Sequence, residues 1–85
     1  MRTFTYVITD PIGIHARPAG QLVKKAQQFE SKIVIEHNGV KSEATRLMSL
    51  MGMGIRHGDT VQVTIEGADE EKALEQMQAF FQEAL

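Results

Sequence analysis

Residues 32–44 read KIVIEHNGVKSEA, and the dipeptide Asn38-Gly39 divides this stretch into two short strand-like runs. Asparagine and glycine tolerate the positive φ angles that the tightest hairpin turns require. We therefore predict two strands, KIVIEH and VKSEA, joined by a tight turn. Such a turn leaves its strands antiparallel, so this stretch decides the kind of sheet that the rest of the chain completes.

Two other segments alternate polar and apolar residues, as a strand with one buried face does. They are TFTYVIT at residues 3–9 and TVQVTIE at residues 60–66. The apolar faces of these two runs are formed by Phe4, Tyr6, Ile8, Val61, Val63 and Ile65. The sheet is therefore expected to have four strands.

Three segments favour helices with one apolar side. The first covers residues 16–29, the second runs from about Thr45 to Met53, and the third follows Asp69. Asp69 is expected to cap the third helix, because aspartate is a favoured N-cap residue. The apolar stripes of the first and third helices are formed by Ala19, Leu22, Val23, Ala26, Phe29, Ala73, Leu74, Met77, Phe80, Phe81 and Ala84.

The predicted order of elements is β-α-β-β-α-β-α. Strands with one apolar face and helices with one apolar stripe bury these surfaces against each other in two layers. We therefore expect an α+β fold, an open-faced two-layer sandwich in which a four-stranded antiparallel sheet carries three helices on one face. No linker or repeat interrupts the chain, so a single domain is expected to span residues 1–85.

The composition excludes several classes of protein. The chain has no cysteine, which rules out disulfides and thiolate zinc sites. The first residues alternate in polarity, and no run of about eighteen apolar residues occurs, so we expect a cytoplasmic protein without membrane insertion. The lack of an arginine-rich tract and the scarcity of aromatic residues argue against nucleic acid as a partner.

The net charge of −2 conceals an uneven distribution of charged residues. Residues 1–58 contain eight Lys or Arg against four Asp or Glu, whereas residues 59–85 contain one against seven. A basic surface attracts an anion or an acidic partner. The alternative is that these are ordinary solvated charges, and the counts alone leave both interpretations open.

The stretch GIHARPAG at residues 13–20 marks the start of the first helix. Gly13 permits an unusual turn, and Pro18 fits the first helical turn, where an N–H group has no helical partner. The backbone N–H groups of Ala16 and Arg17 are therefore expected to be free, and free amides at a helix N-terminus form an anion site. The Arg17 guanidinium adds donors that match the oxygens of a phosphate.

His15 stands where serine, threonine, aspartate or asparagine usually caps a helix. Histidine is a nucleophile that is partly neutral at neutral pH. A nucleophile beside amides and a guanidinium suits a phosphoryl group better than an acyl group, because acyl transfer by serine needs a hydroxyl and none is adjacent in sequence. The alternative is that the His15 ring caps the helix weakly and does no chemistry.

GIHARPAG resembles the active-site signature of HPr, the histidine-containing phosphocarrier family of the bacterial phosphotransferase system. The resemblance covers essentially the whole chain, including NGV in the hairpin, LMSLMGMGI in the short helix and GDTVQVTIEGADEEKAL into the last helix. It implies that Nδ1 of His15 accepts a phosphoryl group from phosphorylated enzyme I, itself charged by phosphoenolpyruvate, with Arg17 as the charge partner. It also implies transfer onward to the IIA domains of sugar permeases. Such a chain is a stoichiometric carrier, not an enzyme, and we expect a monomer without a cofactor.

LMSLMGMGI is apolar on more than one side, and a short helix can bury only one face. Leu47, Met48 and Met51 share a face, whereas Leu50 lies nearer the opposite one. Methionine suits a surface that packs against several partners, although all four residues could instead belong to the core. The resemblance implies that enzyme I and IIA domains dock on Leu47, Met48 and Met51, with Arg17, Lys24 and Arg46 at the rim.

Two positions depart from the family pattern. Ile12 stands where members often have a small polar residue, and Arg46 stands where members from low-GC Gram-positive bacteria typically carry a regulatory serine. Control by phosphorylation at position 46 is therefore not expected, and Thr45 or Ser49 would be weak substitutes. The competing hypothesis for the chain is a regulatory binding module of the same shape that signals by its phosphorylation state, without a role in transport.

The two remaining histidines, His37 and His57, lie far from His15 in the sequence and lack the short spacing of metal ligands. We expect both to be solvent-exposed loop residues and expect no metal site.

Overall fold

The computed structural model describes residues 1–85. Its elements are β1 (Arg2–Val7), α1 (Ala16–Ala26), β2 (Lys32–His37), β3 (Val40–Glu43), α2 (Leu47–Met51), β4 (Thr60–Glu66) and α3 (Glu70–Ala84). Their order is the predicted β-α-β-β-α-β-α. None of these helices combines the length and the apolar character that crossing a membrane would require.

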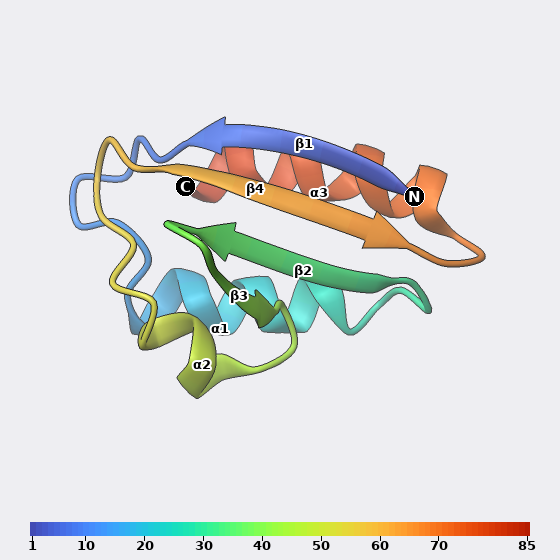
Figure 1. Ribbon diagram of the computed structural model, residues 1–85, viewed down its shortest axis with the longest axis horizontal. Helices are drawn as coiled ribbons and strands as arrows, with labels where there is room; N and C mark the ends of the chain where they lie inside the picture. The colour runs from blue at the N-terminus through green and yellow to red at the C-terminus, as the bar shows by residue number, and fades with distance from the viewer.

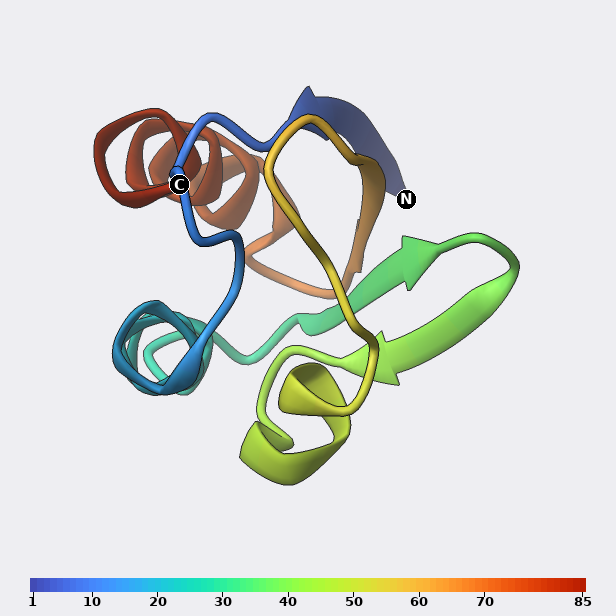
Figure 2. The same cartoon turned by 90° about the vertical axis from the view of Figure 1, so that its left-hand side faces the viewer.

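The four strands form one open antiparallel sheet in the order β1-β4-β2-β3 (Figure 1). The long helices α1 and α3 lie side by side behind the sheet, and α2 extends this layer beside α1 and β3 (Figure 2). The other face of the sheet carries no helix. An antiparallel sheet whose strands alternate needs only one covering layer, so the predicted α+β sandwich with an open face is confirmed.

The β2–β3 hairpin turns at the predicted dipeptide. Asn38 has φ 50° and Gly39 has φ 79°, and the register pairs His37 with Val40. Positive φ at both central residues gives the turn a twist that matches its strands. Because the turn fixes the register, Ile33, Ile35 and His37 all point into the buried layer, and their neighbours point outward.

The core lies between the sheet and the two long helices. The alternation predicted for residues 3–9 and 60–66 is confirmed, since the buried residues there include Phe4, Ile8, Val61, Val63 and Ile65, with Tyr6 partly buried. The ring of Phe81 in α3 lies edge-on to those of Phe4 and Tyr6, with centroids 5.5 Å apart in both pairs. Full burial of one large apolar side chain contributes about 2–3 kcal/mol, so packing against the sheet is what holds α3 in place.

The first helix ends earlier than predicted, at Ala26 instead of residue 29. Beyond it, Gln28 N donates to Lys25 O at 3.1 Å and Phe29 N donates to Ala26 O at 3.2 Å. These bonds span three residues instead of four and tighten the last turn. The tightened turn brings Phe29 onto the core although it lies outside the helix.

The predicted cap of α3 is wrong in its detail. Asp69 occupies the N-cap position, but its side chain makes no bond to the helix. The carboxylate instead accepts hydrogen bonds from Glu30 N and Ser31 N, each at 2.9 Å, and from the Ser31 hydroxyl. The bond from the Ser31 hydroxyl, followed by that from Glu30 N, lowers the pKa of Asp69. Asp69 therefore ties the loop before β2 to the start of α3.

Candidate functional site at the start of α1

His15 is the residue immediately before α1, in the N-cap position. Its backbone is extended, with φ −113° and ψ −172°, and its side chain makes no bond to the helix. The ring is partly exposed and has no hydrogen-bond partner in the protein. The alternative in which the imidazole caps the helix is therefore wrong, and both ring nitrogens are left for a ligand or solvent.

The first turn of α1 presents two unpaired backbone N–H groups. Those of Ala16 and Arg17 have no acceptor in the chain, because the residues four positions earlier lie outside the helix. Pro18 has no N–H group, and Ala19 N donates to His15 O at 2.9 Å. Free amides and the positive end of the helix dipole attract negative charge. No acidic residue lies in this first turn, so no side chain there competes for the amides.

A tight turn over residues 10–13 precedes His15. Ile12 N donates to Asp10 Oδ1 at 2.9 Å, and Gly13 N donates to Asp10 O at 3.0 Å. Gly13 has φ 85°, and a Cβ at this position would lie 2.6 Å from Arg56 Cα. Both the backbone angle and the close approach require glycine here.

This turn rests on the loop between α2 and β4. Ile14 N donates to Ile55 O at 3.1 Å, Gly58 N donates to Ile8 O at 2.8 Å, and Ile8 N donates to Asp59 O at 2.9 Å. The two loops lie together at one end of the sheet, where they face the viewer in blue and yellow (Figure 2). The residue next to His15 is thus held by a segment about forty positions away in the sequence.

The basic residues predicted around the site differ in how they are engaged. Arg17 and Lys24 are exposed on α1 and form no ion pair in the protein. Arg46, just before α2, lies 3.4 Å from Glu43, measured between Nε and Oε2. Arg17 is therefore free to meet an anion beside His15, whereas the charge of Arg46 is partly balanced within the chain.

The short helix α2 buries one face only. It is five residues long, shorter than the predicted segment 45–53, and Leu50 is its buried residue. The exposed fractions of Leu47, Met48 and Met51 are 40%, 77% and 39%. These three residues form what we call the α2 apolar face, and their exposure contradicts the alternative that all of them belong to the core. Ile12, on the turn before His15, is also an exposed apolar residue, with an exposed fraction of 69%.

Comparisons with known proteins identify the family. The phosphocarrier protein HPr of Mycoplasma genitalium is 42% identical over 80 residues, which cover 93% of this chain and 91% of that protein. Residues 2–83 match the family model described as PTS HPr component phosphorylation site. The chain belongs to the HPr family. HPr proteins are phosphocarriers of the phosphotransferase system, abbreviated PTS.

Solved structures agree with this assignment. The crystal structure of HPr-C-His from Thermoanaerobacter tengcongensis has a TM-score of 0.91 and 34% identity, and the match covers 96% of this chain and 92% of that one. The catabolite repression protein Crh of Bacillus subtilis, whose crystal form is described as a dimer with a swapped domain, has a TM-score of 0.77 and 36% identity. That match covers 89% of this chain and 87% of the Crh chain.

One histidine of this HPr chain is not where the sequence analysis placed it. His37 is 7% exposed, not a solvent-exposed loop residue, and its Nε2 lies 3.0 Å from Asp59 Oδ2. The alternation of β2 could have predicted this burial, because His37 lies on the same face of the strand as the inward-facing Ile33 and Ile35. His57 is exposed, as predicted.

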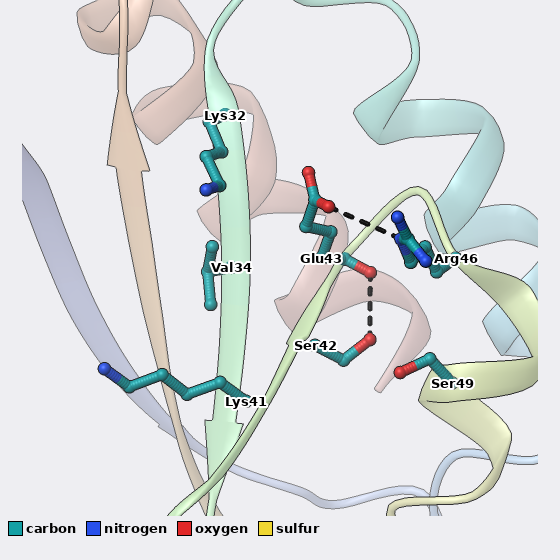
Figure 3. Close-up of a pocket in the computed structure, with 7 residues that line it drawn as sticks. All are labelled: Lys32, Val34, Lys41, Ser42, Glu43, Arg46 and Ser49. Carbon is teal, nitrogen blue, oxygen red and sulfur yellow. Dashed lines mark hydrogen bonds and ion pairs between the residues drawn. The ribbon is translucent and has the colours of Figure 1, made fainter.

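A hollow on the surface of this HPr chain lies away from His15. It has a volume of about 380 Å³ and is bounded by β2, β3 and the start of α2 (Figure 3). Its basic side chains are Lys32, Lys41 and Arg46. Glu43 pairs with Arg46 inside the hollow, and each lysine lies opposite a glutamate in the strand register. The Arg46 charge in the hollow is therefore already paired, and His15 is not among the residues that line it.

Proposed function

We propose that His15 is the phosphorylated residue of a phosphocarrier, which accepts a phosphoryl group from phosphorylated enzyme I and passes it to the IIA domains of sugar permeases. The observation that carries the proposal is the unpaired His15 ring beside the free amides of Ala16 and Arg17 and the unpaired Arg17 guanidinium. Membership of the HPr family supports the choice of partners, because PTS phosphocarriers work between a phosphoryl donor and acceptors.

The proposed reaction uses groups that the structure leaves unpaired. The lone pair of Nδ1 in the neutral His15 ring forms a bond to phosphorus. The bond between phosphorus and the donor breaks, and its electron pair leaves with the donor. The transferred group carries negative charge, which the amides of Ala16 and Arg17 and the Arg17 guanidinium stabilise by charge-assisted hydrogen bonds. Onward transfer runs the same step in reverse, with an acceptor nucleophile on the IIA domain.

The proposed partners dock on the α2 apolar face, with Lys24 and Arg46 at its rim. Its exposed methionines have flexible side chains that can pack against unrelated surfaces. Transient partners need rapid release, so each interface is expected to bury less than about 1,200 Å². The protein is then a stoichiometric carrier, because each molecule is itself modified and must be recharged by enzyme I before it transfers again.

The direct test is a labelling assay with purified enzyme I, phosphoenolpyruvate and Mg²⁺, in which the magnesium serves enzyme I. The wild-type protein is expected to gain one phosphoryl group that is labile in acid and stable in alkali, and His15→Ala is expected to gain none. His57→Ala, which removes an exposed side chain that forms no hydrogen bond in the protein, is the matched control and is expected to label normally. Labelling that survives in His15→Ala would show that another residue is the acceptor.

A second assay separates a carrier from a binding module. A strain that lacks its own HPr is expected to recover sugar uptake when it expresses this chain, and not when it expresses His15→Ala. A module that only signals its phosphorylation state would bind partners and leave uptake unrestored, and that outcome would overturn the transport role.

A further inference from the structure

The buried His37 side chain lies at a junction between the sheet and the loop beside the proposed site. It is the last residue of β2, its ring is almost wholly buried, and its only polar partner is the Asp59 carboxylate at 3.0 Å. A buried polar ring is costly without a partner, so this contact holds both groups in one geometry. The sheet is the rigid partner in the pair, because β2 is hydrogen-bonded on both sides, to β3 and β4.

Asp59 connects His37 to the loop between α2 and β4. Its Oδ2 also accepts a hydrogen bond from Arg56 N at 2.9 Å, and Asp59 N donates to Arg56 O at 3.0 Å. One carboxylate oxygen therefore joins the end of β2 to a closed turn over residues 56–59. The bond from Arg56 N is the largest cause that lowers the pKa of Asp59, so the carboxylate stays charged and remains a strong acceptor.

The turn over residues 56–59 and the adjoining Ile55 in turn hold the segment that ends at His15. Ile14 N donates to Ile55 O at 3.1 Å, and the Cα of Gly13 lies against the backbone of Ile55 and Arg56. A shift of this turn would therefore move Ile14, which is covalently joined to His15. The path from β2 to His15 consists of one side-chain contact, one closed turn and one backbone hydrogen bond.

We propose that His37 is a positioning residue for phosphoryl transfer at His15, acting through Asp59 and the turn over residues 56–59. This inference rests on the proposed function. His37 touches neither His15 nor the α2 apolar face by any of these contacts. Its loss is therefore expected to lower the rate of transfer within the complex and to leave the affinity of enzyme I for this protein nearly unchanged.

The experiment compares three variants as substrates of phosphorylated enzyme I. His37→Leu fills the buried position with an apolar side chain and removes the hydrogen bond to Asp59. His37→Gln keeps an N–H donor for Asp59. Ile33→Val is the matched control, since it trims a buried residue on the same face of β2 without touching Asp59. His37→Leu is expected to lower kcat about tenfold with KM nearly unchanged, because a small misplacement of a reacting group has large rate effects.

The other two variants distinguish loss of the hydrogen bond to Asp59 from a general change in the packing of β2. His37→Gln is expected to recover most of the lost kcat, and Ile33→Val to keep the wild-type kcat. Hydrogen exchange at Ile14 N–H is expected to be faster in His37→Leu than in Ile33→Val. Equal kcat in His37→Leu and wild type would overturn the proposal, as would an equal loss of kcat in Ile33→Val.

Two outcomes keep the inference apart from the function on which it rests. A wild-type protein that enzyme I does not phosphorylate would overturn the proposed function itself. Normal wild-type labelling with normal kcat in the His37 variants would overturn only the positioning role. If His37→Leu does not fold, Asp59→Asn decides, because it keeps the size of Asp59 and removes its charge; the proposal expects a lower kcat, and an unchanged kcat contradicts it.

Discussion

The two long helices begin at opposite ends of the sheet (Figure 1). Their first turns differ in the charged residues that they carry. At the start of α3, the Asp69 carboxylate is occupied by Glu30 and Ser31, and Glu70 Oε1 accepts a hydrogen bond from Gly67 N at 3.2 Å. Acidic residues fill the first turn, where the helix dipole favours them. Side chains of the protein itself thus supply negative charge at this helix start.

At the start of α1, no acidic side chain in the first turn supplies negative charge. The His15 ring makes no cap bond, two amides are free, and no acidic residue lies in the first turn. The comparison shows that the chain places acidic residues at one helix start and none at the other. A helix start without acidic residues, next to an unpaired arginine, is therefore a candidate site for a negatively charged ligand.

The largest expected effect comes from placing an acidic residue in the first turn of α1. Arg17→Glu is expected to slow phosphorylation by enzyme I at least about 100-fold, because a donor to the transferred group is replaced by a repelling charge. The helix itself is expected to remain folded, since a glutamate near a helix N-terminus is favourable. The rate is measured with phosphoenolpyruvate as the source of the phosphoryl group.

Lys24→Glu is the matched control for Arg17→Glu, because it makes the same change of charge on the same helix away from the first turn. It is expected to affect the rate much less, through docking alone. Equal loss of rate in the two variants would mean that general charge, and not the position of Arg17, controls transfer.

The turn before α1 gives the next largest effect. Gly13→Ala is expected to lower the free energy of unfolding by about 2 kcal/mol, because alanine disfavours positive φ and the new methyl group would overlap the backbone of the loop at Ile55 and Arg56. Denaturant unfolding measures the change. Gly20→Ala is the control, since nothing lies within 4 Å of a Cβ there, and an alanine inside α1 is expected to be neutral or stabilising.

The smallest effect is expected at the start of α3. A change there should alter the stability of the fold without altering phosphoryl transfer at the start of α1. Asp69→Asn is expected to lower Tm at neutral pH on the order of 5 °C and to leave phosphorylation unchanged. Glu71→Gln is the control, because Glu71 is exposed and pairs only with Arg2 at the surface. A loss of phosphorylation in Asp69→Asn would remove the distinction between the two ends.

The pH dependence of this difference has a definite sign. The folded-state pKa of Asp69 lies below its ordinary value of 3.8, so the charged carboxylate stabilises the fold at pH values above 3.8. This contribution is lost as the pH falls through the lowered folded-state pKa. The difference in Tm between wild type and Asp69→Asn is therefore expected to be full at neutral pH and to shrink below pH 3.8.

The parts of the fold that follow local periodicity could be predicted from the sequence. Alternation located β1 and β4, and Asn38-Gly39 located the hairpin, because both signals depend on neighbouring residues only. The consecutive residues His15, Ala16 and Arg17 could be placed at a helix start for the same reason. The exposed face of α2 followed from its shortness.

The contacts that were missed join residues far apart in the chain. Asp69 reaches Ser31 across 38 positions, and His37 reaches Asp59 across 22. Each of these polar side chains has a simple local interpretation, as a cap or as a loop residue, which tertiary packing overrides. The early end of α1 has a similar cause, because Phe29 turns onto the core.

The central claim is that the free amides at the start of α1 hold the phosphoryl group on His15, and amide proton shifts test it most directly. In ¹H–¹⁵N spectra recorded before and after phosphorylation by enzyme I, the account predicts large downfield shifts for Ala16 and Arg17. The first-turn amides of α3 serve as the internal reference and are predicted to stay in place. A phosphorylated protein in which the amides of Ala16 and Arg17 do not move would contradict the account.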